Sequence, residues 1–175
     1  MEEFVILVDE NDRETGIMEK MKAHVEAHLH RAFSVFVFNK AGQLMLQQRA
    51  FSKYHSPRLW TNTCCSHPRP GESTSAAAHR RLIEEMGFDC DFNEAFGFVY
   101  KAAFENNLTE HEFDHVFIGT SEEFPVINPE EVAAFRFATM NEIRSEMQQK
   151  PEEFTVWFRI AFDRVDHYFN EKLKT

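Results

Sequence analysis

The stretch AFSVFVFNKAGQLMLQQRA, residues 32–50, decides the fold class of this chain. Residues 32–39 are rich in aromatic and β-branched side chains, which favour a strand inside a sheet. Lys40, Ala41 and Gly42 then supply turn residues, and a second apolar run begins at Leu44. The stretch therefore predicts a β-hairpin that belongs to the core sheet.

A helix is expected downstream, at residues 74–86. Ser73 or Ser75 can cap its first turn, and the alanines together with Leu82 favour helical backbone. Gly87 is placed to end the helix in the left-handed conformation.

Further strands are expected on both sides of this helix, at residues 4–8, 59–66, 95–104, 111–119 and 132–138. The pair at 95–104 and 111–119 is joined by a Glu-Asn-Asn turn. Near the C-terminus, Pro151 suits a first helical turn, and apolar side chains recur at helical spacing over residues 154–169. Strands and helices do not alternate regularly, so one mixed α+β domain over residues 1–175 is expected.

The composition predicts a soluble cytoplasmic protein with a sizeable core. The chain is 43% hydrophobic, yet it has no apolar run long enough to span a bilayer. Its acidic N-terminus lacks the features of a signal peptide. Cys64 and Cys65 are adjacent and Cys90 stands alone, which does not favour a disulfide framework.

The charge balance argues against nucleic-acid and anionic-membrane partners. The chain has 19 Lys plus Arg against 29 Asp plus Glu, a net charge of −10. A small anionic substrate remains compatible with this balance, because it needs only a local basic pocket or a bound cation.

Two glutamates are candidates for a metal site. Glu110 and Glu112 flank His111 in an expected strand, so alternation points both carboxylates to one face and the imidazole to the other. Two close like charges are costly when partly buried unless they bind a cation or take up a proton. With imidazoles from elsewhere the pair would form a mixed nitrogen and oxygen site. A solvated acidic edge is the alternative.

Cys65 is a candidate functional thiol. If residues 61–67 are extended, Cys65 and His67 share one face, whereas Cys64 and Ser66 point to the other. A small buried apolar residue is the alternative interpretation of Cys65.

Two motifs, WTNTCCSHP at residues 60–68 and YKAAFENNLTEHEFDHV at residues 100–116, resemble the type I isopentenyl diphosphate isomerases. The resemblance extends almost end to end through EKMKAH (19–24), HLHRAFSVFVFN (28–39), QRAFSK (48–53), HRRLIEEMG (79–87) and Trp157. It implies a Nudix-like α/β sandwich, a mixed sheet with flanking helices. It also implies an isomerase of isoprenoid biosynthesis that interconverts isopentenyl and dimethylallyl diphosphate. The sequence leaves its oligomeric state, monomer or homodimer, open.

The resemblance implies two metals and a basic pocket. A divalent ion, Mn²⁺, Zn²⁺ or Mg²⁺, is expected on three imidazoles and two carboxylates: His24, His30, His67, Glu110 and Glu112. Glu85 is expected to hold a Mg²⁺ that bridges to the substrate diphosphate. The anionic end of the substrate is expected to meet Lys20, Arg49, Lys53 and Arg81.

The resemblance also assigns the proton transfers. Moving a double bond requires adding a proton to one carbon and removing one from another, with a carbocation-like intermediate. These roles fall on Glu112, assisted by Tyr100, and on Cys65 across the substrate. Trp157 is expected to face the cationic intermediate, with core packing as the alternative.

The helix at 74–86 also resembles a degenerate Nudix box, the metal-binding pattern of diphosphate hydrolases. The residues that fit are Glu72, Arg80, Glu84, Glu85 and Gly87. Ser66 stands at the first glycine position, and Arg81 replaces a glutamate, which weakens a hydrolytic metal cluster and favours an intact diphosphate. A Nudix-type hydrolase is therefore the alternative enzyme, and a catalytically inert metal- or prenyl-diphosphate-binding protein the non-enzymatic one.

Overall fold

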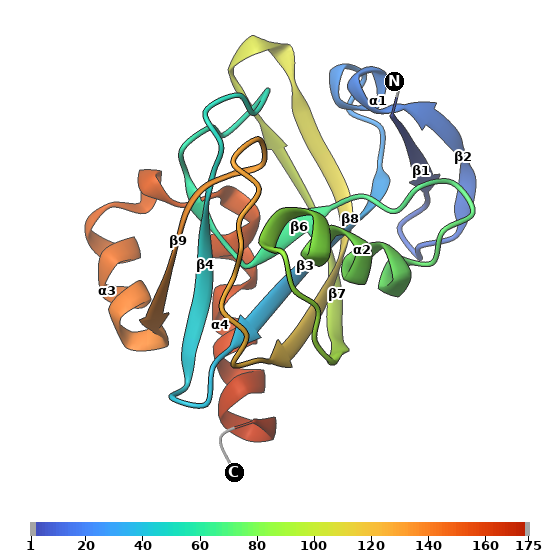
Figure 1. Ribbon diagram of the computed structural model, residues 1–175. Coiled ribbons are helices and arrows are strands. Elements are labelled where there is room, and N and C mark those ends of the chain that lie inside the picture. Colours follow the sequence, from blue (N-terminus) through green and yellow to red (C-terminus); the bar gives the residue numbers. More distant parts are fainter. Residues whose placement is uncertain (1–2, 174–175) are drawn as a thin grey trace.

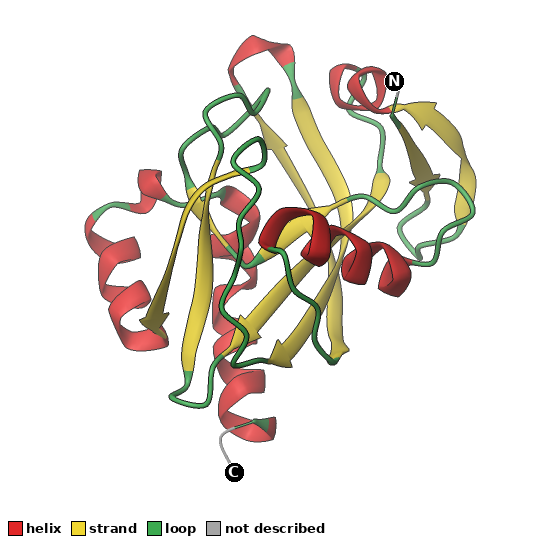
Figure 2. Ribbon diagram, viewed as in Figure 1, coloured by secondary structure: helices red, strands yellow, loops and turns green. Residues whose placement is uncertain are grey.

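The computed structural model describes residues 3–173, which form a curled mixed sheet of nine strands with helices on both faces (Figures 1 and 2). The strands are β1 (Phe4–Val8), β2 (Glu14–Glu19), β3 (His30–Phe38), β4 (Gln43–Arg49), β5 (Trp60–Thr61), β6 (Cys64–Ser66), β7 (Phe92–Ala103), β8 (Thr109–Thr120) and β9 (Val132–Thr139). The helices are α1 (Lys20–Val25), α2 (Thr74–Met86), η1 (Glu105–Asn107), α3 (Met140–Gln149), η2 (Pro151–Glu153) and α4 (Val156–Lys172). None of the helices in this described part is long and apolar enough to cross a membrane.

Strand β3 organises the sheet. It pairs in parallel with β8 from His30↔Glu112 to Phe38↔Thr120, and antiparallel with the short β6. The ladder between β7 and β8 is antiparallel and continues the sheet beyond β8. Because β8 is parallel to β3, its glutamates come to lie beside the first residue of β3, at the end of the sheet where the site forms.

The hairpin expected at residues 32–50 is only partly correct. The turn closes, since Asn39 N donates to Gln43 O at 2.9 Å and Gly42 adopts φ +75°. Within the described residues, however, β3 and β4 pair only at Phe38↔Leu44, and β4 then pairs with β9 from Gln43↔Thr139 onward. Long-range pairing replaces the local hairpin: β3 pairs with β8 and β6, and β4 pairs with β9, which places β3 inside the sheet.

The two faces of β3 face two apolar cores. Phe36 and Phe38 pack toward α4, against Phe158 and Phe169. Val35 and Val37 alternate with them and pack toward α2. A strand covered on both faces has an almost continuous apolar sequence, which is why residues 32–38 show little polar alternation. The architecture is thus the α/β sandwich that was expected.

Helix α2 forms at the expected residues. The Ser73 hydroxyl accepts from Ala76 N at 3.2 Å, and Gly87 ends the helix at φ +75°. A Cβ at Gly87 would also lie 2.5 Å from Val126 O, so glycine is required there by conformation and by space.

The C-terminal helix begins later than expected. Pro151 starts the separate turn η2, and α4 begins only at Val156. Between them, Phe154 bridges to Trp60, and Thr155 N donates to Trp60 O at 3.0 Å. This contact with β5 holds residues 154 and 155 extended and separates the two helices.

Three elements were not expected from the sequence. Strand β2 and helix α1 occupy a polar stretch without clear periodicity, and α1 is capped by the Glu19 carboxylate, which accepts from the backbone of Met21 and Lys22. Helix α3 has a capping box formed by Thr139 and Glu142. This Thr-x-x-Glu spacing is a recognisable signal for a helix start.

Candidate functional site

A cavity of about 670 Å³ lies between the N-terminal strands, the loop before β5, strands β6 and β8, and helices α2 and α4. Many of the residues singled out in the sequence line it, and they come from both halves of the chain. These are Lys20, Arg49, Lys53, Cys65, His67, Arg81, Glu110, Glu112 and Trp157. The other four, His24, His30, Glu85 and Tyr100, are buried behind its wall.

One wall contains a cluster of imidazoles and a carboxylate. Each of the side chains of His24, His30, His67 and Glu112 offers one ligand atom, and these atoms lie within 4.8 Å of one another. His67 Nε2 is 2.8 Å from Glu112 Oε1, and His30 Nε2 is 3.6 Å from the same oxygen. These four side chains thus converge from helix α1, the start of β3, the residue after β6 and strand β8.

Two of these imidazoles have an unsatisfied nitrogen. His24 Nδ1 donates to Lys20 O at 2.7 Å, and His30 Nδ1 donates to His28 O at 2.8 Å. Each Nε2 therefore carries a lone pair, and both Nε2 atoms are buried without a hydrogen-bond partner. A buried polar atom without a partner costs about 1–3 kcal/mol. A divalent cation would satisfy both nitrogens, so the donor set fits a metal.

The protonation of the cluster also suits a metal. Burial lowers the pKa of His67 to about 3, and burial is likewise the main cause of the lowered pKa of His24. Burial alone would raise the pKa of Glu112, but the adjacent His30 and His67 imidazoles outweigh it and hold that pKa well below its ordinary value. For His30, burial would lower the pKa, but the neighbouring Glu112 outweighs it and raises that pKa. His24 and His67 are thus neutral imidazoles beside an ionised Glu112, which are the ligand forms that a cation requires.

Glu110 adjoins this cluster through a residue that the sequence did not single out. Its Oε1 lies 2.8 Å from His55 Nε2, and His24, His55 and Glu110 form a second potential ligand group that shares His24 with the first. His55 is 5% exposed and stacks on the Phe104 ring at 4.9 Å. It lies in an irregular loop, where no periodicity marks a residue as buried.

Tyr100 bridges the two glutamates. Its hydroxyl lies 2.6 Å from Glu110 Oε2 and 2.6 Å from Glu112 Oε2. Burial raises the pKa of Tyr100 well above its ordinary value, so the hydroxyl keeps its proton. As expected from strand alternation, both carboxylates point to one face, while His111 on the other face contacts Ala27 O through Nδ1.

Cys65 lines the cavity, and its neighbour Cys64 is buried in the core beneath α2. This is the alternation expected for an extended strand. Arg49 Nη1 lies 3.9 Å from Cys65 Sγ. Burial raises the pKa of Cys65 to about 12, and the nearby Arg49 opposes this shift only in part, so the thiol is protonated in this geometry.

Trp157 and Arg49 form the end of the cavity near Cys65. The Arg49 guanidinium is held by carbonyl oxygens of His55 and Ser56, both at 3.1 Å, and lies 5.2 Å from the centre of the Trp157 ring. The Trp157 Nε1–H donates to Asn62 Oδ1 at 3.2 Å. The tryptophan is thus both a core residue of α4 and part of the cavity lining, so the two interpretations of its role are compatible.

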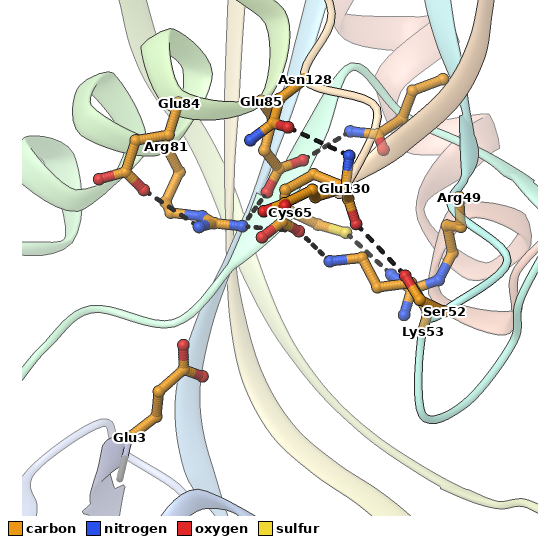
Figure 3. A network of polar contacts seen from close by, with 12 residues as sticks. Glu3, Arg49, Ser52, Lys53, Cys65, Arg81, Glu84, Glu85, Asn128 and Glu130 are labelled. Carbon is orange, nitrogen blue, oxygen red and sulfur yellow. Dashed lines mark hydrogen bonds and ion pairs between the residues drawn. The ribbon is translucent and has the colours of Figure 1, made fainter. Parts of the chain in front are cut away.

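The remaining basic residues are all paired with carboxylates, and Figure 3 shows the network around Lys53 and Arg81. Lys20 pairs with Glu3 at 2.8 Å. Arg81 Nη2 lies 2.6 Å from Glu85 Oε1 and 3.2 Å from Glu131 Oε2. Lys53 donates to the same Glu131 oxygen. Glu131 was missed in the sequence because it lies in a loop between two elements, without a motif.

Glu85 is buried below these cations. Its Oε2 accepts a hydrogen bond from Gln47 Nε2 at 2.8 Å, and its side chain is only 3% exposed. The arginine at position 81 therefore forms an ion pair with a carboxylate of the Nudix-like helix.

The comparisons with known proteins agree with this geometry. Residues 28–158 match the NUDIX domain family. The chain is 52% identical over 165 residues to an isopentenyl-diphosphate Delta-isomerase from Pectobacterium atrosepticum, covering 94% of this chain and 92% of the relative. The protein of the same name from Burkholderia multivorans is also 52% identical, with 94% of each chain covered.

Solved structures share the fold at low sequence identity. DR0079 from Deinococcus radiodurans has a TM-score of 0.71 at 21% identity, covering 84% of this chain and 90% of that one. The MutT protein from Methanosarcina mazei Go1 has a TM-score of 0.68 at 18% identity, covering 82% and 96%. Taken with the near full-length matches to curated relatives, these findings show that the chain has a NUDIX domain and belongs to the isopentenyl-diphosphate Delta-isomerase family.

Proposed function

We propose that this chain interconverts isopentenyl diphosphate and dimethylallyl diphosphate by metal-dependent addition and removal of protons. The observation that carries the proposal is the arrangement of one cavity. Glu112 lines one wall with the Tyr100 hydroxyl hydrogen-bonded behind it, Cys65 comes from another strand, and Lys53 and Arg81 also line the cavity. An acid, a base and a binding site for a diphosphate are the parts that this reaction needs.

Two metal sites are part of the proposal. The site for Mn²⁺, Zn²⁺ or Mg²⁺ comprises His24, His30, His67, Glu110 and Glu112. A Mg²⁺ held with the substrate diphosphate is assigned to Glu85. When bound, the first ion would orient the Glu112 carboxyl group and tune its acidity.

The chain's own residues carry the proton transfers. Before the reaction, Glu112 has to take up a proton, because its carboxylate is ionised in this geometry. The protonated Glu112 carboxyl group, hydrogen-bonded to Tyr100, then gives this proton to the terminal =CH₂ carbon, which leaves a positive charge on the tertiary carbon. The Cys65 thiolate then takes a proton from the adjacent CH₂ group, and the electron pair of that C–H bond forms the new double bond. Trp157 at the cavity wall stabilises the cation in between, by about 2 kcal/mol when desolvated.

Cys65 has to enter this cycle as a thiolate, so the proton that its thiol carries in this geometry passes to Glu112 before each turnover. Its raised pKa makes the thiolate a strong base once formed. The Arg49 guanidinium is the cation placed to stabilise it, because its Nη1 lies 3.9 Å from Sγ.

The proposal further retains a small-molecule prenyl diphosphate as partner, a single isomerase domain over residues 1–175, a cytoplasmic location and a monomeric or homodimeric state. These rest on the sequence. Arg81 disfavours the hydrolase alternative. Its guanidinium nitrogens form ion pairs with the carboxylates of Glu84 at 3.0 Å and Glu85 at 2.6 Å, and so compete with the metal ions of a hydrolytic site for these carboxylates.

One experiment tests the function. The metal-loaded protein is incubated with isopentenyl diphosphate in D₂O and followed by NMR. Deuterated dimethylallyl diphosphate is the expected product. Release of phosphate would instead indicate a hydrolase, and an unchanged substrate would indicate an inert binding protein.

Metal binding is expected to stabilise the fold. A cation that binds only the folded state adds about 2.7 kcal/mol at a concentration 100 times its Kd, which corresponds to roughly 5–10 °C in Tm for a chain of this size. Thermal melts with and without Mn²⁺ measure this shift. His24→Gln should abolish most of it, and His111→Gln, on the opposite face of β8, should keep it. An equal shift in both variants would contradict the ligand assignment.

His55 is expected to act on the metal through Glu110. Its Nε2–H donates to Glu110 Oε1 at 2.8 Å, and residues that orient a ligand typically contribute 10- to 100-fold to metal affinity. His55→Phe keeps the ring that stacks on Phe104 but removes this donor. Titration calorimetry with Mn²⁺ should show a loss of about that size, and His55→Gln should recover part of it. Wild-type affinity in His55→Phe would exclude this role.

A further inference from the structure

Glu131, directly before β9, connects two cations that come from different parts of the chain. Its Oε2 accepts from Lys53, in the loop after β4, and from Arg81 Nη2, on α2. Figure 3 shows Lys53 and Arg81 converging from opposite sides of this network. The carboxylate therefore occupies the region where the cationic side chains meet.

The backbone holds Glu131 in this place. Its carbonyl accepts from Ala50 N at 3.0 Å, and its own N–H donates to Asn128 O at 3.0 Å. Asn128 N in turn donates to Glu85 O at 2.9 Å. The loop is thus tied to the segment that carries Lys53 and to the helix that carries Arg81, so the contact is a built part of the cavity wall.

Glu131 carries a negative charge there. Its side chain is 24% exposed, and burial by itself would raise its pKa, but the hydrogen bond from Lys53 and the charge of Arg81 outweigh burial and lower the pKa. Glu131 also lines the cavity. An anionic ligand that enters has to compete with this carboxylate for both cations.

The competition depends on the form of the ligand. A free diphosphate meets the Glu131 carboxylate at the cavity wall and is repelled by it. A diphosphate complexed with Mg²⁺ is less negative, and its hard cation accepts carboxylate as well as phosphate oxygens. Displacing Glu131 from Lys53 and Arg81 is therefore less unfavourable for the magnesium complex than for the free anion.

We propose that Glu131 is a specificity-determining counter-ion, which neutralises Lys53 and Arg81 before the substrate binds and makes the cavity select magnesium-complexed diphosphates over free anions. The inference rests on the proposed function, because it concerns the diphosphate end of the same cavity. It assigns to Glu131 a role in binding, not in proton transfer.

The test measures binding of inorganic pyrophosphate by calorimetry, with and without Mg²⁺, to the wild type, Glu131→Gln and Glu130→Gln. Without Mg²⁺, Glu131→Gln should bind pyrophosphate about tenfold tighter than the wild type. The reason is that the variant lacks the carboxylate that pairs with Lys53 and Arg81 in the free protein and competes with the ligand. The gain in affinity that Mg²⁺ brings should shrink by a similar factor. Glu130→Gln removes the same charge from the adjacent, exposed residue and should behave as the wild type.

Two results would overturn the proposal. One is a Glu131→Gln protein that binds magnesium-free pyrophosphate no tighter than the wild type. The other is an equal gain in Glu130→Gln, which would show a general effect of net charge. Glu131→Ala must reproduce the direction found with Glu131→Gln. Pyrophosphate contains no double bond, so these measurements do not depend on whether the D₂O assay finds isomerisation.

Discussion

Replacing Cys65 by alanine is expected to lower kcat for isomerisation by about 10²- to 10⁴-fold, the usual contribution of one positioned acid or base. The thiol is the proton-accepting group proposed on β6, and alanine cannot take its place. Because Cys65 lies at the cavity and not in the core beneath α2, circular dichroism should show an intact fold. Turnover is measured by NMR with isopentenyl diphosphate.

The adjacent cysteine provides a matched control. Cys64→Ala removes the same thiol one residue earlier, but Cys64 is buried in the apolar core. This variant should lose stability by creating a small cavity and should retain turnover when it is assayed below its Tm. Near wild-type kcat in Cys65→Ala would falsify the assignment of the base, whatever Cys64→Ala shows.

Glu112→Gln is expected to have the second large effect, because it removes a proton donor and a metal ligand together. The carboxylate touches His67 at 2.8 Å and the Tyr100 hydroxyl at 2.6 Å, and the amide reproduces its shape but not its charge or acidity. We expect kcat to fall by about 10²- to 10⁴-fold or more, and Mn²⁺ affinity to fall with it. Turnover and metal content are measured on the same preparation.

Asp114 provides the control for this variant. It lies two residues further along β8 on the same face, and Ser34 Oγ donates to its Oδ2 at 2.8 Å. Burial, and then the charge of Glu112, raise the pKa of Asp114 well above its ordinary value, so both disfavour a charge on its carboxyl group. Asp114→Asn should therefore keep both metal and turnover. A Glu112→Gln protein with full metal content and normal turnover would rule out both roles assigned to Glu112.

Local sequence determined the elements whose signals lie within a few residues. The cap at Ser73 and the stop at Gly87 delimit α2 without reference to the rest of the chain. Strand alternation placed Glu110 and Glu112 together, and it separated Cys65 from Cys64. The motif resemblance then supplied the family, which the near full-length relatives show. These are properties of single segments and of motifs.

Only the tertiary structure decided which segments lie together. Residues 32–38 have the composition of a strand, but nothing in them specifies parallel pairing with β8 instead of a hairpin with β4. His55 and Glu131 lie in loops, where neither a period nor a cap marks them. Their roles arise from contacts with Glu110, Lys53 and Arg81, which are up to 78 residues away in the chain. Periodicity describes which way a side chain faces along its own element, whereas a binding site depends on which elements face each other, and long-range packing decides that.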